Sequence, residues 1–74
     1  MKSFNKPFYT AVGAKIKQQR INQGFTREKL AQRAEISDKF LYDIEVGNKG
    51  MSADTLWRIS VALKISPEVL LDGV

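Results

Sequence analysis

The chain contains neither cysteine nor histidine. Without cysteine it can form no disulfide framework and no thiolate metal site. Without histidine it lacks the usual general base of enzymes and the commonest ligand of transition metals. The sequence offers no other nucleophile–base or metal-ligand constellation. An enzyme is therefore the least favoured class of function, and we expect neither a cofactor nor a metal.

Long apolar runs are missing as well. The longest apolar stretches are only a few residues, so we expect no membrane span. The first ten residues, MKSFNKPFYT, contain lysines but lack the apolar core of a secretory signal. We therefore expect a soluble, cytoplasmic protein. Its 74 residues make one small domain, and because such a core rarely supplies more than roughly 3–5 kcal/mol, tight helix packing or a partner chain is expected.

Charge is distributed unevenly along the chain, whose net charge is +4. Residues 1–33 carry eight lysines and arginines against Glu28 alone, a balance of +7. Residues 34–74 carry four lysines and arginines against seven acidic residues, a balance of −3. A solvated surface would explain the lysines. The alternative is that the first half faces phosphate groups while the second half faces protein or solvent.

The spacing of apolar residues predicts five helices and no strand. Phe8, Val12 and Ile16 recur every four residues, which is the pattern of an amphipathic helix. Pro7 separates this helix from an arm, residues 1–7, that we expect to be loose. The expected helices cover residues 8–23, 27–34, 38–46, 53–63 and 67–71, so the folded domain is predicted to span residues 8–74.

Residues that favour helix ends separate these segments. Hydroxyl side chains that can accept a hydrogen bond from the first turn precede four of the helices. Glycines, which adopt the left-handed conformation readily, follow two of them. The predicted N-caps are Thr26, Ser37, Ser52 and Ser66, the last followed by Pro67 and Glu68, and the predicted stops are Gly24 and Gly47.

Three of the helices have an apolar stripe that predicts the core. The stripes consist of Leu30, Ala31 and Ala34; of Leu41 and Ile44; and of Leu56, Ile59 and Leu63 with help from Trp57 and Ala62.

Residues 26–45, TREKLAQRAEISDKFLYDIE, contain two short helices joined by about three residues, the unit that places a helix in the DNA major groove. With the helices arranged in this way, the chain resembles the Xre/Cro-like helix-turn-helix family, which includes the lambdoid phage repressors. The resemblance covers about Val12 to Leu71 and implies an all-α, five-helix, lambda-repressor-like DNA-binding domain. Its matching pieces are VGAKIKQQRINQGFTREKLAQRA, IS, FLYDIEVGNKGMSADTLWRISVAL and ISPEVLL.

Three positions depart from the family pattern. Arg27 stands where glutamine is common. Arginine can reach a phosphate, but it lacks the amide group with which the glutamine braces a neighbouring base-reading side chain. Glu35 stands where glycine is usual in the turn, so either the turn tolerates a side chain or its backbone differs; at positive φ it would cost on the order of 1 kcal/mol. Tyr42 replaces a small polar residue, and its ring can pack on a sugar or on a thymine methyl group.

The resemblance places the DNA-reading side chains on the second motif helix, opposite Leu41 and Ile44. Lys39 suits guanine O6 and N7, whereas the two acids there repel phosphate and suit only a donor edge such as cytosine N4. Alternatively, Ser37 and Asp38 only cap the helix, and the charged side chains are solvated. The expected base-reading residues are Asp38, Lys39, Tyr42 and Asp43; the expected backbone contacts are Lys17, Thr26, Arg27, Ser37, Asn48 and Lys49.

Two further features follow from the resemblance. Arg20 and Glu45 match an arginine and an acid that pair in the related repressors, so we expect a structural ion pair between them. The C-terminal end commonly forms a two-fold dimer interface in the family. We expect such an interface here, although its apolar residues could instead close the monomer core; the residues concerned are Ile65, Val69, Leu70, Leu71 and Val74.

Two functions from different classes remain open at this stage. The first is a sequence-specific transcriptional regulator of double-stranded DNA in the prokaryotic nucleoid. We expect a small homodimeric repressor of a phage, a mobile element or an autoregulated operon, with no small-molecule effector domain. The second is a helix-turn-helix scaffold that binds a protein partner, as antitoxins do. The acidic second half and Tyr42 keep this alternative open.

Overall fold

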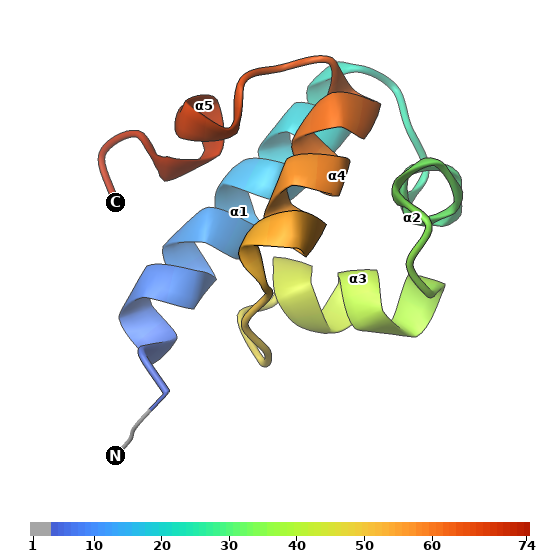
Figure 1. Ribbon diagram of the computed structural model, residues 1–74. Coiled ribbons are helices and arrows are strands. Elements are labelled where there is room, and N and C mark those ends of the chain that lie inside the picture. Colours follow the sequence, from blue (N-terminus) through green and yellow to red (C-terminus); the bar gives the residue numbers. More distant parts are fainter. Residues whose placement is uncertain (1–3) are drawn as a thin grey trace.

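The computed structural model describes residues 4–74 as a chain of five helices, with no strand among these residues (Figure 1). The expected all-α, five-helix fold is confirmed. The helices are α1 (Lys6–Asn22), α2 (Arg27–Ala34), α3 (Asp38–Glu45), α4 (Ala53–Leu63) and α5 (Pro67–Leu71).

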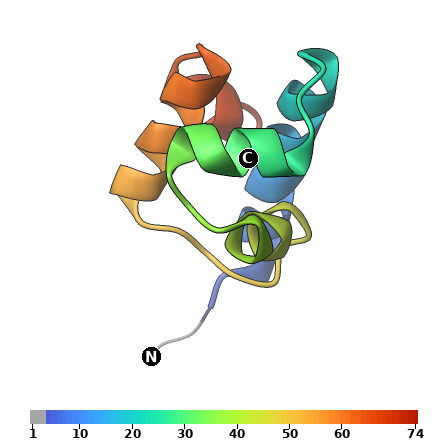
Figure 2. The same cartoon turned by 90° about the vertical axis from the view of Figure 1, so that its right-hand side faces the viewer.

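The two motif helices cross steeply. In Figure 1, α2 is seen end-on and α3 from the side, whereas in Figure 2 the two are reversed. Helix α2 packs mainly against α4, and α3 packs against α1 and α2. Helix α5 lies away from α3 in both views, so α3 and the C-terminal end occupy different sides of the molecule.

Apolar residues from all five helices form one core. The expected stripe residues Leu30, Leu41 and Ile59 are completely buried. The expectation for Trp57 is wrong, because 57% of this residue is exposed. It lies on the outer face of α4, between the buried Thr55 and Ile59, so helical spacing points it away from the core. The buried apolar residues are Val12, Ile16, Leu30, Ala31, Ala34, Leu41, Ile44, Ile59, Leu63 and Leu70.

Helix α1 begins at Lys6, two residues before its expected start. Pro7 lies in the first turn, where a backbone N–H would have no partner within the helix. The side chain of Asn5 accepts a hydrogen bond from the Phe8 amide and caps this turn. The expected loose arm therefore overlaps the helix at Lys6 and Pro7, and its first three residues lie outside the described residues.

The predicted caps Thr26, Ser37 and Ser52 each accept a hydrogen bond from the first turn of the helix that follows. Ser66 is the N-cap residue of α5 as predicted, but it lacks the expected side-chain hydrogen bond. Its hydroxyl donates to the Glu68 carboxylate at 3.1 Å and makes no cap bond to α5.

Long side chains from elsewhere in the chain cap the C-terminal ends of α2, α3 and α4. Arg58 of α4 donates to the carbonyl oxygens of Ala34 and Glu35, both at 3.2 Å. Lys6 of α1 donates to the Gly47 carbonyl at 2.9 Å, just beyond α3. Gln23 donates to the Leu63 carbonyl at 2.6 Å. The turn of the motif is thereby anchored to α4, and the end of α3 is anchored to α1.

Helix α1 touches the end of α3 backbone to backbone at Gly13. A Cβ atom there would collide with the Ile44 carbonyl oxygen and lie 3.0 Å from that of Glu45. Glycine in the middle of a helix normally costs about 1 kcal/mol relative to alanine. At this position, however, only glycine leaves space for the last turn of α3.

Gly13→Ala is therefore expected to destabilise the fold by about 1–3 kcal/mol, the usual cost of overpacking. The atoms that its Cβ would meet belong to the backbone of α3, which cannot change rotamer as a side chain can. Urea denaturation measures the loss. Gly50→Ala is the control: the nearest atoms to its Cβ would be those of the Tyr9 ring, at 2.8–3.0 Å, and a side chain can shift. A stabilised Gly13→Ala variant would contradict the close contact.

Candidate nucleic-acid interface

The turn between α2 and α3 accepts a residue other than glycine. Glu35 adopts φ 60° and ψ 43°, in the left-handed region, so the first of the two alternatives for this position holds. The next amide, from Ile36, donates to the Ala31 carbonyl at 3.0 Å and closes the end of α2. Arg58 fixes the Glu35 carbonyl from the other side. These contacts offset a conformational cost on the order of 1 kcal/mol.

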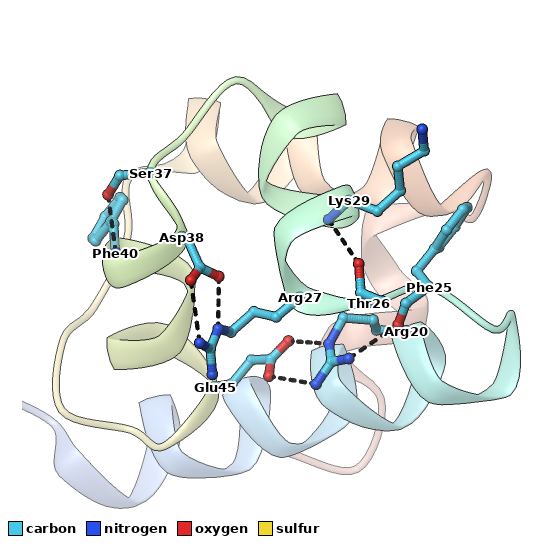
Figure 3. Close-up of polar contacts among 9 residues, drawn as sticks. All are labelled: Arg20, Phe25, Thr26, Arg27, Lys29, Ser37, Asp38, Phe40 and Glu45. Atoms are coloured by element: carbon cyan, nitrogen blue, oxygen red, sulfur yellow. Dashed lines mark hydrogen bonds and ion pairs between the residues drawn. The ribbon is translucent and has the colours of Figure 1, made fainter.

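Arg27 and Asp38 connect the first residues of the two motif helices (Figure 3). The arginine Nε donates to Asp38 Oδ1 at 2.7 Å, and its Nη2 donates to Oδ2 at 3.2 Å. Both side chains are also partly exposed, at 38% and 42%. The hydrogen bonds from Arg27 hold the pKa of the Asp38 carboxyl below its ordinary value. Although it replaces the family's glutamine, Arg27 thus braces the neighbouring Asp38, contrary to the expectation that bracing is lost.

Tyr42 lies on the same exposed side. The guanidinium carbon of Arg27 is 5.2 Å from the centroid of its ring, within the range of a cation–π contact. The ring is exposed, as expected for a residue that could touch DNA.

Asp43 does not face solvent with the other expected base-reading residues. It is only 4% exposed, so the expectation that it is open to DNA together with them is wrong. Its Oδ2 accepts a hydrogen bond from Lys39 Nζ at 2.9 Å and lies 3.5 Å from Lys49 Nζ. The Lys39 hydrogen bond holds the pKa of this carboxyl below its ordinary value. Lys39, which is exposed, covers the acid and remains available to a partner.

Arg20 and Glu45 form the ion pair that was expected of them (Figure 3). Nε and Nη2 of the arginine donate to the two carboxylate oxygens at 2.8 and 3.1 Å, and Nη1 donates to the Phe25 carbonyl at 3.0 Å. Both side chains are largely buried, with 12% and 4% exposed. This network ties α1 to the end of α3 and to the segment before α2.

The other expected backbone contacts lie on the surface. Thr26 and Ser37 use their oxygens as acceptors for the amides of Lys29 and Phe40, and each hydroxyl proton remains free to bond elsewhere. The cap role and a phosphate contact are therefore compatible for both. Lys17, Asn48 and Lys49 are exposed as well.

Three residues whose side chains anchor helix ends were not expected from the sequence. Lys6, Gln23 and Arg58 act through long side chains that reach carbonyl groups distant in sequence. Apolar spacing carries no signal for such contacts. Only the pairing of Arg58 with Asp54, four residues apart on α4 and 3.1 Å apart in space, could have been expected from the sequence.

The C-terminal residues divide between core and surface. Leu70 is fully buried and closes the monomer core, so its expected role in an interface is wrong. Ile65 packs partly against the same core. Val69, Leu71 and Val74 remain exposed. A second exposed apolar pair, Trp57 and Val61 on α4, was not expected.

Residues 4–74 contain no helix that is both long enough and apolar enough for a membrane span. The same residues contain no group of three or more acidic, cysteine or histidine side chains that could hold a metal ion.

Comparisons with known proteins agree with this arrangement of helices. A family model described as a helix-turn-helix domain matches residues 13–74. The control protein C.BamHI of Bacillus amyloliquefaciens is 36% identical over 61 residues, which are 81% of this chain and 75% of C.BamHI.

Two solved structures are also similar. One is SinR of Bacillus subtilis, described as the master regulator for biofilm formation and solved in complex with DNA. It is 32% identical and has a TM-score of 0.79, and the match covers 82% of this chain and 98% of SinR. The restriction-modification controller protein C.AhdI from Aeromonas hydrophila has a TM-score of 0.82 over 84% of this chain and 94% of that one. At 22% identity, C.AhdI supports the fold alone.

The five helices and the braced turn define a small helix-turn-helix domain. The chain belongs to the Xre/Cro-like helix-turn-helix family, and it is a DNA-binding regulator. The alternative of a scaffold that serves only protein binding is not favoured.

Proposed function

We propose that the protein is a sequence-specific repressor of an autoregulated operon, a phage or another mobile element. The observation that carries the proposal is the group of Asp38, Lys39 and Tyr42 on α3, partly or largely exposed, on a helix whose end the Arg20–Glu45 pair fixes. The similarity to C.BamHI, a control protein, supports a regulatory role of this kind. We infer that the protein acts on DNA in the cytoplasm, at the nucleoid, and that it is not an enzyme.

Base contacts and phosphate contacts are expected to come from different residues. Lys39 has its ammonium group beside Asp43, at a position where it can still donate to guanine O6 and N7. Asp43 itself is covered by lysines, so we place base reading on Asp38, Lys39 and Tyr42. Phosphate binding falls to the N-terminal amides of α2 and to exposed surface groups. These groups are Lys17, Thr26, Ser37, Asn48 and Lys49.

We further propose that the protein binds DNA as a homodimer. One recognition helix covers only a few base pairs, too few to select a site in a genome, and two-fold pairing doubles the footprint. The candidate interface is the C-terminal surface, defined here as the exposed residues Val69, Leu71 and Val74. This surface lies away from α3, so pairing there leaves both recognition helices accessible.

Fluorescence polarisation with labelled duplexes tests the DNA-binding proposal. Affinity for DNA from upstream of the gene should exceed affinity for random DNA. It should also fall steeply with salt, because each neutralised phosphate adds roughly −0.9 to the log–log slope. If about six phosphates are contacted, the loss between 50 and 200 mM salt is about 10³-fold. Equal, weak binding to all duplexes, or none, would contradict a sequence-specific repressor and favour the protein-binding scaffold.

A further inference from the structure

The pair of Arg27 and Asp38 leaves the carboxylate able to accept further hydrogen bonds. The arginine uses one edge of its guanidinium, through Nε and Nη2, and contacts one carboxylate oxygen with each nitrogen. A carboxylate oxygen has two lone pairs, so each still has one available. Because 42% of the Asp38 side chain is exposed, a partner can reach them.

The arginine also fixes the direction of this carboxylate. Two parallel hydrogen bonds define the plane of both groups, which a single ammonium contact cannot do. The guanidinium lies over the Tyr42 ring, one helical turn beyond Asp38 on α3. One side chain from α2 therefore sets the positions of two exposed groups on α3.

The pairing resolves the electrostatic problem of an acid in a DNA-reading helix. An unpaired carboxylate would be repelled by the phosphates, whereas the Arg27–Asp38 pair has no net charge. An aspartate is ionised at neutral pH, and Arg27 lowers the pKa of Asp38 further, so the carboxylate acts only as an acceptor. Among bases in the major groove, cytosine presents the N4 amino donor, whereas the amino group of adenine lies beside N7, which would repel a carboxylate.

We propose that Arg27 is a positioning residue for base readout, which holds Asp38 so that this side chain accepts a hydrogen bond from cytosine N4. The inference rests on the proposed DNA-binding function. It reassigns Arg27, which was expected to contact the DNA backbone. In this role Arg27 keeps Nε and Nη2 on Asp38, and the phosphate contacts fall to Lys17 and Lys49, exposed cations without a bidentate partner.

The test is selection of preferred sites from a randomised duplex library by the native chain, followed by affinity measurements on single-base variants of the selected site. Asp38→Ala should lose the preference for cytosine at one position in each half-site, a preference of about 5-fold to 150-fold. Arg27→Ala should lose the preference at the same position. The double variant should lose no more than Asp38→Ala alone.

Arg27→Lys is the variant that separates positioning from phosphate binding. It keeps the positive charge but cannot form the planar bidentate pair. It should therefore retain affinity for random DNA and lose the cytosine preference. Lys39→Ala is the matched control on the same helix, and it should change preference at a different position only. Because the Arg27 and Asp38 side chains are both more than one-third exposed, their variants should fold, which circular dichroism checks.

Two results would overturn the inference while leaving the proposed function intact. In the first, Arg27→Ala keeps the cytosine preference but binds every duplex more weakly. If the slope of log affinity against log salt also falls by about 0.9 in magnitude, Arg27 contacts a phosphate. The other is a selected site without any position that depends on Asp38. If the native chain selects no sequence at all, the proposed function fails, and the inference fails with it.

Discussion

Arg20→Ala is expected to destabilise the fold by roughly 3–5 kcal/mol, the usual cost of removing one member of a buried ion pair. Glu45, whose side chain is 4% exposed, would be left buried without its two hydrogen bonds, and the Phe25 carbonyl would lose a donor. A core of this size supplies a similar total, so the variant should be largely unfolded at room temperature. Thermal and urea denaturation of the native chain and the variant measure the difference.

Two further variants show whether the loss comes from the isolated charge. Replacing both Arg20 and Glu45 with leucine should recover most of the stability, because an apolar pair often substitutes for a buried ion pair without loss. Arg33→Ala is the matched control: its guanidinium also contacts Phe25, with the carbon 4.8 Å from the ring centroid, but it has an exposed position. Nearly native stability of Arg20→Ala, together with weaker DNA binding at equal folded fraction, would reassign Arg20 to phosphate binding.

Features determined by neighbouring residues in the sequence could be predicted well. The span of α2 was predicted correctly, and the ends of the other helices to within about two residues, because caps and apolar spacing act within a few residues. The caps Thr26 and Ser37 show this, since each acceptor and donor are only three residues apart. The Arg20–Glu45 pair is not local, and it was expected only because both positions match the family.

Features that depend on packing between helices could not be predicted. Spacing on a helix shows which residues share a face, but it does not show what covers that face. Asp43 illustrates the problem: it lies among the polar positions of α3, yet Lys39 and Lys49 cover it. The pair of Arg27 and Asp38, eleven residues apart, likewise depends on how the turn directs the first turns of both helices toward each other.

Trp57 and Leu70 show the same limit for apolar residues. A tryptophan in an apolar stripe was expected in the core, but its position on α4 points outward. Leu70 and Leu71 are adjacent and chemically identical, yet one is buried and the other exposed. Only the direction in which α5 meets α1 and α4 distinguishes them.

Leu71→Asp is expected to abolish the proposed dimer and weaken specific DNA binding by about 100-fold or more, because the second half-site then no longer binds as part of the same molecule. The monomer should remain folded, since 38% of Leu71 is exposed. Analytical ultracentrifugation measures assembly, and polarisation measures binding to an inverted repeat. The native dimer should require half-sites centred about 34 Å apart, so that both α3 helices enter the major groove on one face of the DNA.

Trp57→Asp serves as the control, because it introduces the same charge at the other exposed apolar surface. If the C-terminal surface forms the interface, Trp57→Asp should dimerise and bind like the native chain. If instead Trp57→Asp gives monomers and Leu71→Asp does not, the dimer pairs through α4. A native chain that sediments only as a monomer at high concentration and protects a single half-site would contradict both arrangements. The proposed base-reading residues lie on α3 and are unchanged in both Leu71→Asp and Trp57→Asp. The variant that loses the dimer should therefore show the larger loss of specific binding.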